Sequence, residues 1–357
     1  PLPVAGLDGQ YVYRSESLLV RLLSYQHGSF LGDLDIGKGI LESFGGALGR
    51  MDHSLSDFRN PEIKSRRISW DLAHLGKAYD NLPYIKDPSR KALVQYFYQQ
   101  YELIVRPVWH RLPMQIIHND ANEWNVLVDG DEVGFIDFGD SVYTARICEV
   151  AIAITYAVMG QSDPLEKACL LLRAYVHELP LEESEIELLY YLVAGRLIQS
   201  ILHAALGQEM EPENEYLQIS QQPAWALLEK WVMINPVRAE RRFKEVAGID
   251  QSLDNSDLLV KRSKYFSAAM SLSYKRPIRM SRAAFQYMYD TEGNTFLDAY
   301  NNIPHVGHSH PRVVEAGQRQ MAKLNTNTRY VYDLLNEYAE RLLSKFPDHL
   351  NKVYFVN

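Results

Sequence analysis

Four polar residues near the middle of the chain have the types and spacing that phosphoryl transfer requires. They are arranged as His118-x-Asp120-x-x-x-x-Asn125, followed by Asp137 at the start of an Asp-Phe-Gly triplet. Transfer of a phosphoryl group from a nucleotide needs a carboxylate that accepts the proton of the attacking hydroxyl, and oxygen ligands that hold Mg²⁺ against the phosphates. We therefore predict that Asp120 is the catalytic base and that Asn125 and Asp137 are the Mg²⁺ ligands. His118 is predicted to support the catalytic loop from behind.

Short apolar runs flank these residues and predict the strands that position them. Gln115–Ile117 and Val126–Val128 enclose the polar loop, and a Gly-Asp turn leads into Gly134–Ile136, which ends at Asp137. A plain β-hairpin is the alternative interpretation, because turns favour both Asp and Asn. The presence of both patterns in one stretch favours the catalytic interpretation.

The same stretch resembles a known kinase family. His-Asn-Asp-x-x-x-x-Asn-Val-Leu and Ile-Asp-Phe-Gly-Asp are similar to the motifs of the aminoglycoside phosphotransferase and choline kinase group, and most similar to its hydroxylysine-kinase-type branch. Protein kinases normally carry Arg at the position of Asn119, which makes them a poorer match. The resemblance implies a protein-kinase-like large lobe, mainly helical with small β-hairpins. It also implies phosphorylation of a hydroxyl on a small, usually amine-bearing metabolite, with Mg²⁺ and ATP or GTP.

The N-terminal residues predict a hairpin across residues 11–24. In the resembling group this region ends the small lobe, and Leu23, Ser24 and Tyr25 would form the hinge that holds the nucleotide base. Such kinases also need a Gly-rich loop and a strand Lys, yet the first Lys of this chain is Lys38. The chain begins with Pro rather than Met. We expect it to be cut at both ends, to lack the nucleotide lid, and to be inactive as a fragment.

Apolar residues at helical spacing predict a mainly helical core. Helices are expected over residues 36–55, 89–110, 146–159, 163–178, 182–206 and 225–234. The glycines of the first helix, Gly45, Gly46 and Gly49, suggest close packing against a neighbour. Glu149 is the single carboxylate of an almost wholly apolar helix, so it must have a partner or lie at an edge.

The Trp70-Asp71 pair has two possible roles. We favour Trp70 as a core anchor and Asp71 as a helix cap. The resembling branch also has Trp-Asp here, so a contact between Asp71 and a substrate ammonium group is kept as a hypothesis. Side chains that could line a substrate pocket are Tyr190, Tyr191, Arg196, Gln199 and His203.

The last part of the chain resembles a second family. Residues 287–298 predict two short strands across a turn, and Pro311 begins a predicted helix to about Leu324. Asp-x-x-Gly-x-x-Phe-Leu-Asp, Gly-His-x-His-Pro and the segment 324–330 are similar to the N-terminal part of class III aminotransferases. The branch they resemble most is the phospho-lyases that depend on pyridoxal 5'-phosphate (PLP).

This resemblance implies that residues 261–357 are the entrance segment of a fold-type-I PLP-dependent transferase. A strand at Val353–Asn357 would lead into the phosphate loop, and the Schiff-base Lys would follow much later. The PLP-binding residues would then lie beyond Asn357, and this segment alone is expected to be inactive as an aminotransferase. Arg329 is a candidate for the substrate's phosphate, because a guanidinium matches phosphate bidentately. An exposed helix-cap Arg is the alternative.

These patterns predict an α+β chain in three parts: a kinase domain lacking most of its small lobe (residues 1–235), a linker (236–260) and the aminotransferase segment (261–357). The charged, mixed sequence of the linker also allows a connecting helix. Phosphorylation turns a hydroxyl into a good leaving group, and PLP can stabilise the carbanion that expels it. We predict a bifunctional kinase and aminotransferase or phospho-lyase that acts on an amino alcohol or hydroxy amino acid. The alternatives are a non-catalytic kinase-like binding module and an aminoglycoside-modifying phosphotransferase.

The composition is that of a globular protein, 46% hydrophobic and 23% charged. A net charge of −8 without a basic stripe argues against nucleic acid as a partner. Cys148 and Cys169 lie in apolar contexts and indicate free thiols in a reducing compartment. No run approaches about 18 uninterrupted apolar residues. We therefore predict a cytoplasmic protein with no membrane partner, which forms a homodimer through a full PLP domain as in the resembling group.

Overall fold

The computed structural model describes residues 2–212, 215–249, 256–267, 269–301, 305–326 and 329–355, without the side chains of residues 215–220, 256 and 257. The chain divides into two compact units, Pro1–Pro311 and Arg312–Asn357. The helices are α1 (Lys38–Leu55), α2 (Pro61–Ser65), α3 (Leu75–Tyr79), α4 (Pro88–Gln100), α5 (Ile147–Ala157), α6 (Pro164–Glu178), α7 (Glu183–Ile186), α8 (Leu189–Met210), α9 (Glu215–Trp231), α10 (Pro236–Val246), α11 (Ser256–Tyr265), α12 (Pro311–Lys323) and α13 (Asp333–Leu343). The strands are β1 (Pro3–Val4), β2 (Tyr13–Arg14), β3 (Leu19–Val20), β4 (Leu22–Leu23), β5 (Ser29–Phe30), β6 (Met114–Ile117), β7 (Val126–Asp129), β8 (Glu132–Phe135), β9 (Val142–Ala145), β10 (Met280–Ala284), β11 (Tyr287–Asp290) and β12 (Thr295–Leu297).

Two small antiparallel sheets of the first unit carry the predicted site. Strands β5, β7 and β8 form one sheet, and β6 pairs with β9 in the other. The two strands expected on either side of the polar loop and the third strand expected after the Gly-Asp turn are confirmed. Their bounds differ from the predicted ones by one or two residues. Because β6 leads into the polar loop and β8 ends just before Asp137, the predicted catalytic and metal residues lie at the strand ends.

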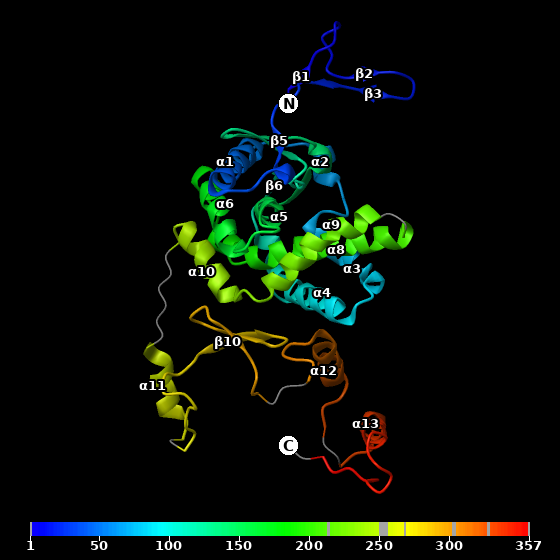
Figure 1. Cartoon of the computed structure of the whole chain (residues 1–357), viewed down its shortest axis with the longest axis vertical. Coiled ribbons are helices and arrows are strands. Elements are labelled where there is room, and N and C mark those ends of the chain that lie inside the picture. Colours follow the sequence, from blue (N-terminus) through cyan, green and yellow to red (C-terminus); the bar gives the residue numbers. More distant parts are fainter. Residues whose placement is uncertain are drawn as a thin grey trace. The chain divides into compact units, whose positions relative to one another are not determined.

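Helix α1 packs closely on α6, and two glycines make this contact possible (Figure 1). A Cβ atom at Gly45 would lie 2.1 Å from the backbone oxygen of Leu171, and one at Gly49 would lie 2.8 Å from that of Tyr175. The predicted close packing of this helix is confirmed. Since α1 also contacts β6 and β8, the helix pair supports the strands that carry the site.

Helices α5 and α8 form the centre of the first unit. Every residue of α5 except Tyr156 is buried, and α8 packs against α4, α5 and α9. By length and composition, α8 is the one described helix that could cross a membrane. However, 72% of its most apolar window is buried inside the structure, as in the core helix of a globular domain.

The helix predicted over residues 89–110 is only partly confirmed. Helix α4 ends at Gln100, and the chain continues as a π-helical turn over Tyr101–Val105 and a 3₁₀ helix over Arg106–Arg111. Pro107 has no N–H group to donate to residue 103, so a regular α-helix cannot continue through it. The helix predicted over residues 182–206 is likewise divided, into α7 and α8.

The segment 236–260, predicted as a linker, contains helix α10, which packs against α6, α7 and α8. Lys244 donates from Nζ to Glu183 at 2.7 Å and to Glu187 at 2.8 Å, and Phe243 is fully buried. Residues 236–246 therefore form a helix with an amphipathic face covered by the helical core, which agrees with the connecting-helix alternative. The division of the chain into domains at 235 and 260 stays a prediction.

The antiparallel strands β10, β11 and β12 belong to the same compact unit and contact the end of the helical region. Asn235 donates from Nδ2 to the carbonyl oxygens of Asp290 at 2.9 Å and Asn294 at 2.8 Å, while the hydroxyl of Tyr289 donates to the carbonyl of Val232. The strands predicted within residues 287–298 are confirmed, as is the helix that begins at Pro311.

Two chain ends complete the description. Near the N-terminus, β2 pairs with β3 as the predicted hairpin, and β4 pairs with β1. The strand predicted at Val353–Asn357 is not found over residues 353–355, and Val356 and Asn357 lie outside the described residues. A β-strand needs a neighbouring strand for its backbone hydrogen bonds, and the described residues pair none with this segment.

Candidate active site

His118 connects the two halves of the predicted site. Its ring is fully buried; Nε2 lies 2.9 Å from the carbonyl oxygen of Ile136, and Nδ1 lies 3.2 Å from the backbone nitrogen of Asp120. The carbonyl requires a donor and the N–H requires an acceptor, so the hydrogen is assigned to Nε2. One ring therefore links the catalytic loop to the residue before Asp137, as the predicted supporting role requires.

The loop also depends on a buried carboxylate from α5. Asn119 has a positive φ of 70°, and its backbone N–H donates to Glu149 Oε2 at 3.0 Å. Burial raises the pKa of Glu149, while His118 and the two backbone N–H groups of residues 118 and 119 oppose that rise. The prediction that Glu149 needs a partner is confirmed, and this contact offsets the strain of the left-handed backbone at Asn119.

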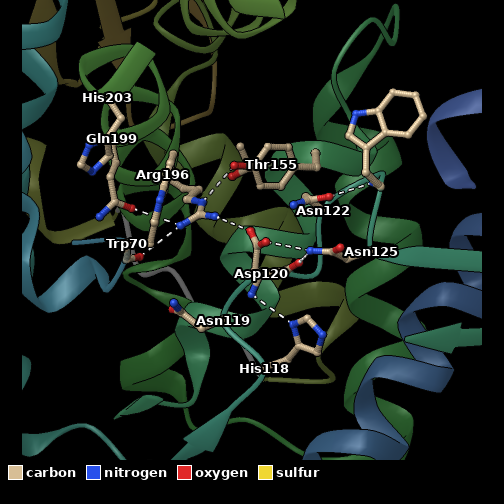
Figure 2. Close-up of polar contacts among 12 residues, drawn as sticks. Trp70, His118, Asn119, Asp120, Asn122, Asn125, Thr155, Arg196, Gln199 and His203 are labelled. Carbon is tan, nitrogen blue, oxygen red and sulfur yellow. Dashed lines mark hydrogen bonds and ion pairs between the residues drawn. The ribbon is translucent and has the colours of Figure 1, made fainter. Parts of the chain in front are cut away.

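Asp120 is held from two sides (Figure 2). Its Oδ2 accepts from Asn125 Nδ2 at 2.7 Å, and its Oδ1 accepts from Arg196 Nη2 at 3.0 Å. The side chain remains 23% exposed, so a substrate hydroxyl can reach it. Burial raises the pKa of the Asp120 carboxyl, and the neighbouring Arg196 guanidinium opposes that rise. This is a partly accessible carboxylate in a fixed orientation, as a general base requires.

The predicted metal ligands lie on adjoining backbone. Asn125 uses its amide nitrogen on Asp120, so Oδ1 is the amide atom that can coordinate a cation. Its backbone carbonyl accepts from the N–H of Ile136 at 3.0 Å, which brings the residue before Asp137 next to it. Asp137 is exposed and left-handed, with φ 59°, and its Oδ1 accepts from Gly139 N at 3.1 Å.

This donor set fits Mg²⁺ bound together with a nucleotide. Mg²⁺ typically takes one or two protein oxygens and completes its shell with phosphate oxygens and water. Asn125 and Asp137 would supply those two oxygens. Within the described ranges, no group of three or more His, Cys, Asp or Glu side chains is placed to enclose a metal, so the protein residues suit a shared cation rather than a closed structural site.

Two arginines, Arg66 and Arg196, position the loops of the site. The sequence did not predict this role for either of them. Arg66 donates to the carbonyl oxygens of Ser141 at 2.8 Å and Gly139 at 2.6 Å, and so fixes the loop after Asp137. Arg196 was predicted only as a possible pocket residue, although it pairs with Asp120. The sequence signal for this role was a single Arg in the apolar part of α8, because a charged residue there needs a partner. It is comparable to the single carboxylate, Glu149, in α5.

Comparison with known proteins agrees with both resemblances. Residues 1–178 match the phosphotransferase enzyme family APH, and residues 269–357 match the class III aminotransferase family. Two segments of the chain thus match two different families, a phosphotransferase segment and a class III segment. The mainly helical architecture with small antiparallel sheets includes the phosphotransferase segment.

The similar proteins divide in the same way. Hydroxylysine kinase of Mus musculus is 27% identical over 229 residues, which cover 60% of this chain and 61% of that protein. Alanine--glyoxylate aminotransferase 2-like of Drosophila melanogaster is 41% identical over 108 residues, 30% of this chain and 22% of that protein. Ethanolamine-phosphate phospho-lyase homolog 1 of Caenorhabditis elegans is 40% identical over 102 residues, 28% of this chain and 22% of that protein. The chain thus spans less than two thirds of each relative.

In the phosphotransferase segment, Asp71 has the geometry of the predicted cap. It is buried, and its Oδ1 accepts from the backbone N–H of Ala73 at 3.0 Å and from the hydroxyl of Thr144 at 2.9 Å. Its contact with a substrate ammonium group stays a prediction. Trp70, in contrast, is only half-buried and is not a core anchor, because its ring lies against Arg196 and His203 at the site.

The remaining predicted residues belong to the N-terminal region and to the second unit. Leu23 ends strand β4, Ser24 donates from its backbone N–H to Leu2 O at 2.8 Å, and Tyr25 is exposed with its ring against His27. Their role as a nucleotide hinge stays a prediction. Arg329 is an exposed residue of the second unit, and phosphate binding by its guanidinium also stays a prediction.

Proposed function

We propose that the phosphotransferase segment transfers the terminal phosphoryl group of ATP or GTP to a hydroxyl of a small amino alcohol or hydroxy amino acid. The observation that carries this proposal is the geometry of Asp120. Its carboxylate is partly exposed and held by Asn125 and Arg196, beside the two oxygen ligands that suit a nucleotide-bound cation. The relatives named hydroxylysine kinase support the choice of acceptor.

Each residue has a defined task in the proposed reaction. Asp120 accepts the proton of the acceptor hydroxyl as its oxygen attacks the terminal phosphorus, and the nucleoside diphosphate leaves. Asn125 and Asp137 would hold Mg²⁺, which when bound neutralises charge on the phosphate oxygens. His118 and Glu149 keep the loop in the conformation that presents Asp120, while Arg66 does the same for the loop that begins at Asp137.

The class III segment extends the proposal to a second reaction. We propose that it belongs to a PLP-dependent aminotransferase or phospho-lyase that consumes the phosphorylated amine or its precursor, and that it forms a homodimer through that domain. The relative named as a phospho-lyase homolog supports this pairing. The resemblance assigns no PLP-binding residue to this segment. A cytoplasmic location, with nucleotide and a small metabolite as partners, completes the proposal.

Two alternatives are less well supported. A non-catalytic binding module would not need Asp120 partly exposed beside two oxygen ligands for a cation. An aminoglycoside-modifying enzyme would have no use for an attached class III segment. Neither alternative accounts for both matched families.

The direct test is a phosphorylation assay with ATP or GTP labelled in the terminal phosphate. The chain, and the product of its complete reading frame, are incubated with Mg²⁺ and with ethanolamine, hydroxylysine or an aminoglycoside. Transfer to one of the first two acceptors is expected, with its loss in Asp120→Asn and with a lower rate and a higher Mg²⁺ requirement in Asp137→Asn. Nucleotide binding without transfer to any acceptor, in both proteins, would instead favour the binding module.

A further inference from the structure

Arg196 is a buried cation whose surroundings are almost entirely neutral. Only 1% of its side chain is exposed. Its Nε donates to the hydroxyl of Tyr156 at 3.2 Å, and its Nη1 donates to the carbonyl of Trp70 at 3.1 Å and to Gln199 Oε1 at 3.3 Å. The guanidinium carbon also lies 4.6 Å from the centre of the Trp70 ring and 5.4 Å from that of Tyr156. Stacking and hydrogen bonds together leave this group little freedom.

Asp120 is the charged group that balances it. Among the described residues, the ion pair of Arg196 is formed with Asp120 alone, at 3.0 Å between Nη2 and Oδ1. A buried charge is costly unless it is paired and hydrogen-bonded. Because Arg196 is fixed in place by its neutral contacts, the pair constrains the more exposed member, Asp120, rather than the reverse. Figure 2 shows Arg196 and Asn125 on different sides of the carboxylate.

We propose that Arg196 is a positioning residue, which holds the Asp120 carboxylate in one orientation. This rests on the proposed role of Asp120 as the catalytic base. With an exposed fraction of 1%, Arg196 has no surface for a nucleotide phosphate or an acceptor, so it acts through Asp120. Oδ1 is held by Arg196 and Oδ2 by Asn125, so the remaining lone pairs of the carboxylate point in defined directions.

The proposal predicts that Arg196→Gln separates kcat from KM. Loss of the second anchor frees the Asp120 carboxylate to rotate, and misplacement of a catalytic group costs on the order of 100-fold in kcat. KM for the nucleotide and for the acceptor changes little, because Arg196 is buried and acts through Asp120.

The test compares two substitutions of Arg196, one of a residue that holds it, and one of another buried arginine. Arg196→Gln is measured beside Arg196→Lys, which keeps the charge but not the planar group, and Tyr156→Phe, which removes the hydroxyl that holds Nε. The matched control is Arg146→Gln, which breaks another largely buried ion pair, to Glu185 at 2.6 Å, away from the site. Thermal unfolding shows which variants are folded. The control is expected to lose stability without a comparable loss of kcat.

A second readout does not depend on turnover. Crystal structures of the unsubstituted protein and of Arg196→Gln are compared at the Asp120 carboxylate. One carboxylate orientation in the unsubstituted protein, and more than one in Arg196→Gln, is expected. If the unsubstituted protein phosphorylates no acceptor, the proposed function fails while this comparison still tests the positioning. Either an unchanged Asp120 orientation or an unchanged kcat in Arg196→Gln, or in Arg196→Lys if Gln prevents folding, would overturn the proposal.

Discussion

The helix below the catalytic loop and the last helix of the chain show how differently two helices of equal length are used. Helix α5 has buried side chains at every position but one, and they pack against α6 and α8. Helix α13 is amphipathic, but none of its residues is buried, and Leu334 and Tyr338 are more than half exposed. Both sequences specify a helix. Only α5 has its apolar surface covered within the described structure. The free energy of unfolding should therefore depend strongly on the side chains of α5 and weakly on those of α13.

Substitution of one aliphatic side chain in each helix gives the largest expected contrast. Ile152→Ala in α5 removes a side chain with 0% exposure, and we expect a loss of about 2–5 kcal/mol in the free energy of unfolding from lost burial and the cavity. The matched change in α13, Leu334→Ala, affects a side chain that is 51% exposed, and should stay within about 0.5 kcal/mol. Denaturant unfolding measures both. Equal losses would show that α13 is covered as α5 is.

The glycines of α1 sharpen the same comparison at a helix contact. Gly45→Ala places a Cβ atom 2.1 Å from the backbone oxygen of Leu171 and should destabilise the phosphotransferase segment by about 3 kcal/mol through overpacking. Gly39 lies in the same helix, with no atom within 4 Å of an added Cβ. Gly39→Ala should therefore stabilise the chain by about 0.5–1 kcal/mol. Thermal unfolding of the Gly45→Ala and Gly39→Ala proteins tests the close contact between α1 and α6.

The contact of Glu149 with the catalytic loop predicts an effect on both stability and activity. Glu149→Ala leaves the backbone N–H of Asn119 buried without its acceptor, which should cost about 1–3 kcal/mol. Glu149→Gln keeps a side-chain oxygen at that position and should retain most of the stability. Unfolding measurements are paired with the phosphorylation assay. A fully active Glu149→Ala protein would contradict the role of this carboxylate in positioning the loop.

The smallest expected effect lies in the class III segment. Hydrogen bonds from the backbone of Asn301 and Tyr300, and from His308 at 2.7 Å, hold the pKa of Asp298 well below its usual value. His308→Ala should raise the pKa of Asp298 only in part, because the backbone donors remain. Asn301→Ala is the matched comparison, since it removes the other side-chain donor, Nδ2 at 2.9 Å, and keeps the backbone N–H. NMR titration of Asp298 measures the shift, and a full return to the ordinary value would show that His308 dominates.

The helices and strands were largely predictable because their signals are local. Periodic apolar residues located α1, α5 and α6, and the glycines of α1 indicated its close contact before its neighbour was known. The errors arose where a local pattern had more than one outcome. Residues 89–110 keep helical spacing through Pro107 but not a regular α-helix. Residues 236–246, whose charged sequence allowed a linker or a connecting helix, form a helix that lies on the core.

The sequence by itself determined the residue types and motif spacing that predict a carboxylate base, two oxygen ligands and a supporting His, together with the resemblance of two segments to two families. The tertiary structure alone decided which distant groups control them. Arg196 reaches Asp120, and Glu149 reaches Asn119, only because α8 and α5 pack beside the catalytic loop. Motif residues close in sequence are placed by one loop, whereas such pairs depend on how helices pack, which no local pattern encodes.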